Sequence, residues 1–156
     1  MAGSPQATLP LELVRQDLGV NQWMAHTLAL WLDDRRWDKH LDLVLESARR
    51  KHRVALSALW RFCEPYLRFT VPEGGIYFWL ELAAGVDATR LRALLDDEGV
   101  GIAPGERFTP DEAGRRYFRL AFLDVDDRDL EAGIAVIGRC LARSAAEDAA
   151  AEEGSS

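Results

Sequence analysis

Basic residues are in short supply in this chain of 156 residues, which has 19 Lys and Arg against 26 Asp and Glu and a formal net charge of −7. Binding to nucleic-acid backbones depends on cationic side chains that release counterions, so we expect no nucleic-acid partner. Long apolar runs are missing too: none approaches the roughly 18 residues of a membrane span, and the N-terminus has no basic stretch followed by an apolar core. These absences predict a cytoplasmic protein that does not insert into membranes.

Cysteine and histidine are also scarce. Cys63 and Cys140 stand far apart without CxxC spacing, which indicates reduced, buried thiols rather than disulfides. No histidine lies three or four residues from another, so His26, His40 and His52 predict no metal site. The sequences GxSxG, GxGxxG, HExxH and the Walker loop do not occur, which leaves hydrolytic, nucleotide-binding and zinc-protease functions without their usual signatures.

Helical periodicity is the strongest pattern present. Apolar residues recur at helical spacing over 11–32, with a break at Gly19, and again over 37–63. A shorter helix is expected between the N-cap Asp87 and a closing glycine, Gly99. The last helix should begin after Asp126, with an apolar stripe made by Leu130, Ile134, Ile137 and Leu141.

Three segments alternate with the period of a β-strand. In residues 76–82, Ile76, Phe78, Leu80 and Leu82 should face one way and Tyr77, Trp79 and Glu81 the other. Residues 100–105 predict a short strand that ends in a turn, and residues 116–122 alternate again. The order of elements predicts an α+β fold, a two-layer sandwich with a small, mainly antiparallel sheet of about three strands and helices packed on one side.

The chain divides by composition into three parts. Residues 1–36 are expected to form an N-terminal helical segment, and residues 37–143 the folded domain. Residues 144–156, "SAAEDAAAEEGSS", are small and acidic with nothing large to bury, so they predict a disordered acidic tail.

Arg119 is the charged residue that the strand pattern does not explain by itself, because it lies in the middle of the otherwise apolar "YFRLAF". It is either a charge on the solvated face of an antiparallel strand or a rigidly held guanidinium that receives a carboxylate. The run "RRKHR" at 49–53 is more ordinary and reads as the charged face of a helix.

Three passages resemble one known family. "FTVPEGGIYFWLEL", "LLDDEGVGIAPGERF" and "YFRLAFLDVDDRDLEAGIAVI" are similar to the C-terminal, small domain of fold-type I pyridoxal-phosphate-dependent aminotransferases of class I/II. More narrowly, they resemble the 2-aminoadipate aminotransferases and the aminotransferase-like domains of MocR transcription regulators. The likeness covers roughly residues 9–142, with Gln22 and His40 placed in the upstream helical passage as that pattern expects.

The resemblance implies roles for three residues. Arg119 would hold the α-carboxylate of an amino-acid or 2-oxo-acid substrate. Gly74 and Gly75 would let the backbone pass close to a substrate cavity against a large cofactor-binding domain, since glycine has no side chain to clash. An internal ion pair of Arg119, or a position away from the glycine turn, would contradict this interpretation.

The departures from the family are as informative as the match. These enzymes hold pyridoxal phosphate on a lysine in an SxSK-like segment, followed by a PGxRxG-like passage, and neither occurs here. Lys39 and Lys51 lie among charged residues of the second helix, without the apolar setting that favours imine chemistry. The resemblance therefore implies the cofactor for the complete protein, which would be a homodimer, and no cofactor or activity for this chain alone.

Three functions remain open at this point. The chain is either the small domain of an aminotransferase-like protein, present as a truncated product, an expression fragment or half of a split enzyme, or the ligand-sensing part of a MocR/GntR-type regulator. A non-catalytic remnant that serves as an interaction module is the third possibility. Whether a winged helix-turn-helix precedes residue 1 separates the second from the first.

Overall fold

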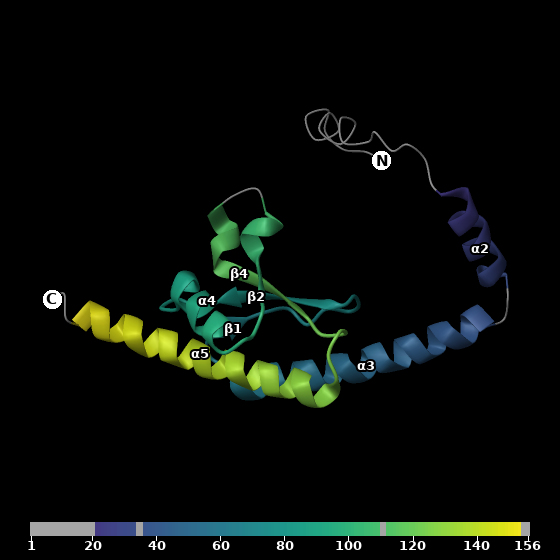
Figure 1. Cartoon of the computed structure of the whole chain (residues 1–156). Helices are drawn as coiled ribbons and strands as arrows, with labels where there is room; N and C mark the ends of the chain where they lie inside the picture. The colour runs from purple at the N-terminus through teal and green to yellow at the C-terminus, as the bar shows by residue number, and fades with distance from the viewer. Residues whose placement is uncertain (1–20, 34–35, 110–111, 154–156) are drawn as a thin grey trace. The chain divides into compact units, whose positions relative to one another are not determined.

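The computed structural model describes residues 21–33, 36–109 and 112–153. These residues fall into two compact units, Met1–Val44 and Leu45–Ser156, each of which is described by itself. The elements in chain order are α2 (Gln22–Leu32), α3 (Arg36–Phe62), β1 (Leu67–Arg68), β2 (Tyr77–Leu82), α4 (Ala88–Asp97), β3 (Ala103–Pro104), η1 (Gly105–Arg107), η2 (Glu112–Arg116), β4 (Tyr117–Ala121) and α5 (Asp127–Glu153) (Figure 1).

The second unit contains one antiparallel sheet with the strand order β1-β2-β4-β3. In the central pair, Trp79 lies opposite Arg119, so the two strands place these side chains on the same face. The α+β class is confirmed, and the sheet has four strands rather than the predicted three. The additional strand is β1, which pairs Leu67 with Leu82.

The core lies between one face of this sheet and the helices. Phe78, Leu80 and Phe118 are buried because every second residue of β2 and β4 points toward the helices. The apolar stripe predicted for the last helix is buried as well, from Leu130 to Leu141. Ile76 departs from the predicted alternation, since it precedes β2 and is 43% exposed.

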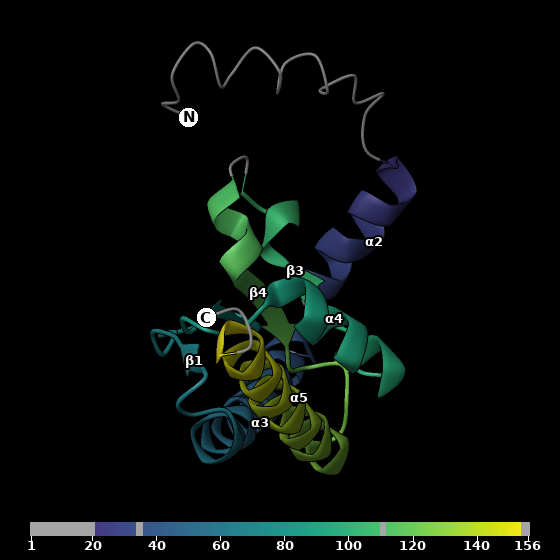
Figure 2. The same cartoon turned by 90° about the vertical axis from the view of Figure 1, so that its left-hand side faces the viewer.

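The second half of α3 and α5 run side by side beneath the sheet (Figures 1 and 2). Gly138 of α5 makes this close approach possible: a Cβ atom there would lie 2.2 Å from the carbonyl oxygen of Phe62 at the end of α3. Glycine therefore sets the distance between the two helices that close the core.

Both predicted N-caps are confirmed. The side chain of Asp87 accepts a hydrogen bond from the Arg90 amide at 2.6 Å and begins α4, and Gly99 follows its end with a φ of +71°. Asp126 accepts one from the Asp129 amide at 2.9 Å and begins α5.

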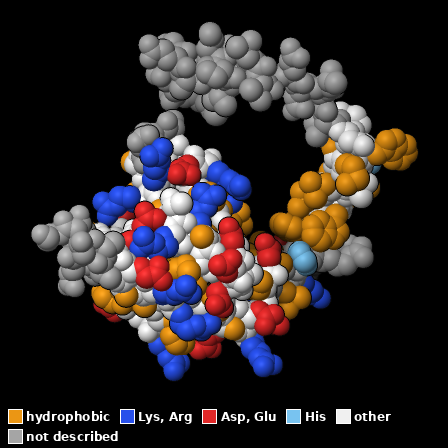
Figure 3. Space-filling model, turned by 60° about the vertical axis from the view of Figure 1, so that its left-hand side comes forward, with side chains coloured by type: hydrophobic (Ala, Val, Ile, Leu, Met, Phe, Trp, Pro, Cys, Tyr) orange, Lys and Arg blue, Asp and Glu red, His pale blue; other side chains and the backbone are white. Residues whose placement is uncertain are grey.

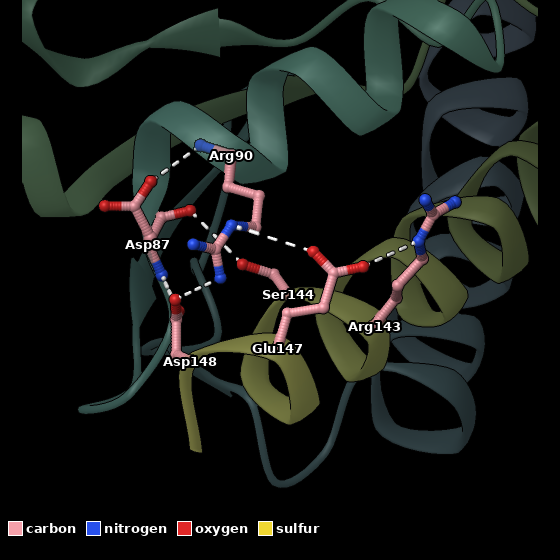
Figure 4. Close-up of polar contacts among 6 residues, drawn as sticks. All are labelled: Asp87, Arg90, Arg143, Ser144, Glu147 and Asp148. Atoms are coloured by element: carbon pink, nitrogen blue, oxygen red, sulfur yellow. Dashed lines mark hydrogen bonds and ion pairs between the residues drawn. The ribbon is translucent and has the colours of Figure 1, made fainter. Parts of the chain in front are cut away.

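Residues 144–153, which belong to the segment predicted to be a disordered tail, are helical and continue α5, while residues 154–156 lie outside the described residues. Polar contacts with the start of α4 explain the difference (Figure 4). The buried Ser144 hydroxyl donates to the Asp87 carbonyl at 3.4 Å, and Asp148 accepts the Asp87 amide at 2.9 Å and pairs with Arg90. Composition alone did not reveal these partners, because they lie far away in the sequence.

The first unit contains α2 and the start of α3. Its apolar side chains are largely exposed, with Trp23 at 85% and Met24 at 68% (Figure 3). Trp31 packs edge-on against Trp37 at 4.9 Å and lies 5.5 Å from the His40 ring. The helix predicted over residues 11–32 is seen from Gln22, and its earlier part lies outside the described residues. The three-part division of the chain stays a prediction.

None of the helices within residues 21–33, 36–109 and 112–153 has both the length and the apolar character that a membrane crossing requires. In the view of Figure 3, acidic and basic side chains alternate over the surface of the second unit.

Candidate functional site

Arg119 lies on β4, on the face of the sheet that points away from the core. Its guanidinium carbon is 3.9 Å from the ring centre of Tyr77 and 4.1 Å from that of Phe108. Tyr77 comes from β2, while Phe108 directly follows the short helix η1. The guanidinium thus contacts two aromatic rings, and these cation–π contacts restrict its movement.

The Nε atom of Arg119 has no partner among the described residues. Its Nε is buried and forms no hydrogen bond, and no residue that the structure describes forms an ion pair with it. A buried donor without an acceptor costs about 1–3 kcal/mol, so the unpaired Nε–H of Arg119 is an unusual feature of this face. The internal ion pair that would have contradicted a carboxylate-binding role is not found within the described part of the chain.

Aromatic side chains cover much of the same face. Trp79 stacks on Tyr117 with ring centres 5.5 Å apart, and meets Phe108 edge-on at 6.0 Å. Sequence reasoning did not assign Phe108 to the site. In the sequence, Phe108 directly follows the turn "APGER". Nothing in the local pattern shows that this turn folds back over β4, so Phe108 could not be assigned to the site from the sequence.

Gly74 and Gly75 lie elsewhere. The turn that contains them faces α3 and helps to line a cavity of about 360 Å³, and Arg119 is not part of its lining. Gly75 has a φ of +97°, which L-amino acids other than glycine rarely adopt, so this turn needs glycine for its backbone. The structure does not bring the two glycines and Arg119 into one pocket, so it gives no support to a substrate cavity shared by the three residues, and Arg119 is a candidate site residue by itself.

The lysines do not form a cofactor site in this chain. Lys39 is exposed on α3, and Lys51 Nζ donates hydrogen bonds to the carbonyl oxygens of Leu123 and Val125. A Schiff-base lysine needs an unpaired amine in an apolar pocket. The two lysines therefore do not fit pyridoxal phosphate.

Neither histidine nor cysteine provides a metal site: no group of three or more His, Cys, Asp or Glu within the described residues could hold an ion. Both cysteines are free and buried, as predicted. Burial raises the pKa of the Cys63 thiol to about 12, and burial also raises the pKa of Cys140. These thiols pack in the core and are protonated at neutral pH.

Aminotransferases are among the relatives of this chain both by sequence and by structure. 2-Aminoadipate transaminase from Thermus thermophilus is 30% identical over 122 residues, which cover 78% of this chain and 30% of the transaminase. The crystal structure of the α-aminoadipate aminotransferase LysN, also from Thermus thermophilus, matches 93% of this chain and 38% of its own, with a TM-score of 0.73 and 29% identity. The HTH-type transcriptional regulator YdcR from Escherichia coli is 34% identical over 102 residues, or 65% of this chain and 22% of the regulator. No family model matches the chain.

Fold and sequence together define the class: the chain has the small domain of the pyridoxal-phosphate-dependent aminotransferases of fold type I. Within this class its relatives include both 2-aminoadipate aminotransferases and MocR-type regulators, as the sequence resemblance implied. The chain spans about a third or less of the length of the curated relatives named above.

Proposed function

We propose that this chain is the C-terminal domain of an aminotransferase-like protein and that its function is to bind the α-carboxylate of an amino-acid or 2-oxo-acid substrate. The observation that carries the proposal is the guanidinium of Arg119, which contacts the rings of Tyr77 and Phe108 and has no anionic partner among the described residues. A guanidinium can bind a carboxylate with two parallel hydrogen bonds, which orients the substrate as well as holding it.

The position on a β-strand supports this role. Arg119 is paired on both sides, with Trp79 of β2 and Ala103 of β3, so its backbone cannot shift independently of the sheet. A binding group on a rigid element loses little entropy when the ligand arrives. The chain would thus contribute orientation of the substrate to a larger protein.

The chemistry of transamination would come from outside these residues. Pyridoxal phosphate supplies the electron sink in this class of enzymes, and we infer that a separate large domain would hold it. We expect this chain alone to bind no cofactor and to be inactive, because Lys51 is engaged with carbonyl oxygens and Lys39 is exposed. A homodimer of the complete protein and a cytoplasmic location belong to the same proposal.

A second candidate function rests on the 34% identity with the regulator YdcR. In a MocR/GntR-type protein, the same carboxylate-binding surface would sense an amino acid instead of converting it. The coding sequence upstream of residue 1 distinguishes the two proposals, since a regulator requires a winged helix-turn-helix before its cofactor domain.

The test of the proposed function is a titration of the purified chain with acetate, compared with chloride at equal ionic strength and followed by NMR of arginine side chains. Acetate should shift the Arg119 Nε signal in a saturable way, and Arg119→Ala should remove the saturable component. Arg68→Ala is the matched control, since Arg68 is an exposed strand residue paired opposite Glu81. An Arg119 signal that acetate leaves unchanged would reduce Arg119 to a charge on the solvated face.

A further inference from the structure

The side chains of the basic run at 49–53 fall into two groups with different surroundings, although all five residues are basic. Arg50 Nε donates to Asp127 at 2.7 Å, and Lys51 donates to the carbonyl oxygens of Leu123 and Val125. These two side chains attach α3 to the segment that leads into α5. These two side chains are therefore engaged in holding the fold together.

The other three members of the run line the cavity on the opposite side. Arg49, His52 and Arg53 form one wall of it, and the turn Pro72–Gly75 forms the other. We call this cavity of about 360 Å³ the α3 cleft; its lining is completed by Leu45 and Ala48. All of it belongs to the second compact unit.

The charges in the α3 cleft are not balanced. Arg49 and Arg53 are exposed, and neither forms an ion pair with a residue that the structure describes, whereas Arg50 between them has a partner. Glu73 is the one acidic side chain in the lining, and two arginines outweigh it. Because residues four apart lie on the same side of a helix, the two guanidinium groups can converge on one ligand.

His52 supplies an independent sign of a missing partner. Its ring is stacked on Phe78 at 5.1 Å and meets Phe122 edge-on at 5.7 Å, so its orientation is fixed by the core. Its Nε2 is sealed from solvent and forms no hydrogen bond with the described residues. Buried polar atoms almost always have a partner, so an unpaired nitrogen in a residue of the cleft wall is an unusual feature.

The opposite wall is open to a ligand. A Cβ atom built on Gly74 or Gly75 would meet no other atom within 4 Å, so the backbone of the turn borders empty space. Glycine leaves this backbone uncovered, and the polar atoms of the backbone can therefore be approached closely.

We propose that the α3 cleft binds a small oxyanion, a phosphate or carboxylate group of a ligand, between Arg49, Arg53 and the turn Pro72–Gly75. The two arginines pair with the oxygens of the anion. Arg119 takes no part, because it lies on the other face of the sheet. The proposal therefore does not depend on the function proposed for Arg119.

The experiment titrates the purified chain separately with inorganic phosphate and succinate, against chloride at equal ionic strength, and follows the His52 ring and the Gly74 and Gly75 amides by NMR. At least one of the two anions should shift these signals in a saturable way, and the tighter one identifies the group that the cleft prefers. Arg49→Gln and Arg53→Gln should each weaken binding by about tenfold.

Two controls separate a site from general attraction to a basic helix. Arg50→Gln removes the same charge one residue away but outside the cleft, and Arg119→Ala removes the other candidate anion site. Both should bind within about twofold of the unmodified chain. Ala48→Phe fills the cleft without changing its charge and should abolish the saturable shift, while circular dichroism shows that the variant remains folded.

The results that overturn the proposal are equally specific. The proposal is wrong if neither phosphate nor succinate gives saturable shifts. It is also wrong if Arg50→Gln and Arg53→Gln weaken anion binding equally. Unchanged binding in a folded Ala48→Phe variant would also contradict it, because it would place the anion outside the cleft.

Discussion

The two faces of the sheet differ in what surrounds their side chains. On one face, Phe78 and Leu80 are fully buried against the helices. On the other, Tyr77 and Trp79 alternate with them along the same strand and are each 38% exposed, with the Arg119 guanidinium between aromatic rings. The side chains of the first face pack against apolar side chains of the core, whereas on the second face the buried Nε of Arg119 has no partner among the described residues.

This difference separates stability from function along a single strand. Burial of apolar area stabilises the fold and needs no ligand. An unpaired buried donor costs free energy in the absence of a ligand, which is why the open face is the one to which we assign the proposed binding role. The comparison predicts that substitutions on the buried face lower stability, while those on the open face alter the order and ligand binding of Arg119.

The largest expected effect comes from the buried face. Phe78→Ala should lower the free energy of unfolding by about 3–5 kcal/mol, because it removes a fully buried ring from the centre of the core. Tyr77→Ala, one residue away on the open face, should cost about 1 kcal/mol or less. Urea unfolding followed by circular dichroism measures both, and equal losses would contradict the division between the faces.

An intermediate effect concerns pH and the region under the buried face. Cys63 is fully buried, and its thiol pKa is raised by burial from 9.0 to about 12. In the unfolded chain the thiol ionises near pH 9, but in the folded chain it stays protonated. The unfolded state therefore binds fewer protons above pH 9, and stability is lost as pH rises from 9 toward 12, by at most about 1.4 kcal/mol per pH unit.

The measurement compares urea unfolding at pH 8 and pH 10 for the unmodified chain and Cys63→Ala. The variant should lose less stability between the two pH values, whatever its packing cost at pH 8. The same loss in both proteins would mean that Cys63 is already accessible to water in the folded state.

The regular parts of this fold were predictable from periodicity. Leu130 and Leu141 recur with the period of a helix and Phe118 and Leu120 with that of a strand, and each period specifies which face is buried. The N-caps at Asp87 and Asp126 were equally readable, because they satisfy backbone amides only three residues away.

Features that depend on distant partners were not predictable. β1 is only two residues long, too short to show alternation, and exists because Leu67 pairs with Leu82. The continuation of α5 beyond residue 144 depends on Arg90 and Asp87 of another helix. For the candidate site, sequence and resemblance indicated Arg119, but the position of Phe108 over its guanidinium follows from the fold of a turn.

The smallest effect on stability should accompany a clear effect on the open face. Tyr77→Leu removes one of the two rings that enclose the Arg119 guanidinium, and a cation–π contact at such a partly exposed position contributes about 0.5–1 kcal/mol. The free energy of unfolding should change by no more than this. The guanidinium, however, loses a ring that restricts its rotation. Rotation about its Cζ–Nε bond, measured by NMR line shape, should therefore become faster, and its Nε–H should exchange more rapidly with water.

Tyr77→Phe is the matched control because it keeps the ring and should retain the slow rotation of the unmodified chain. If Tyr77→Leu left Arg119 as ordered as before, the ring of Phe108 and the strand backbone would suffice to hold it, and the open face would owe its geometry to the turn after β3 rather than to β2.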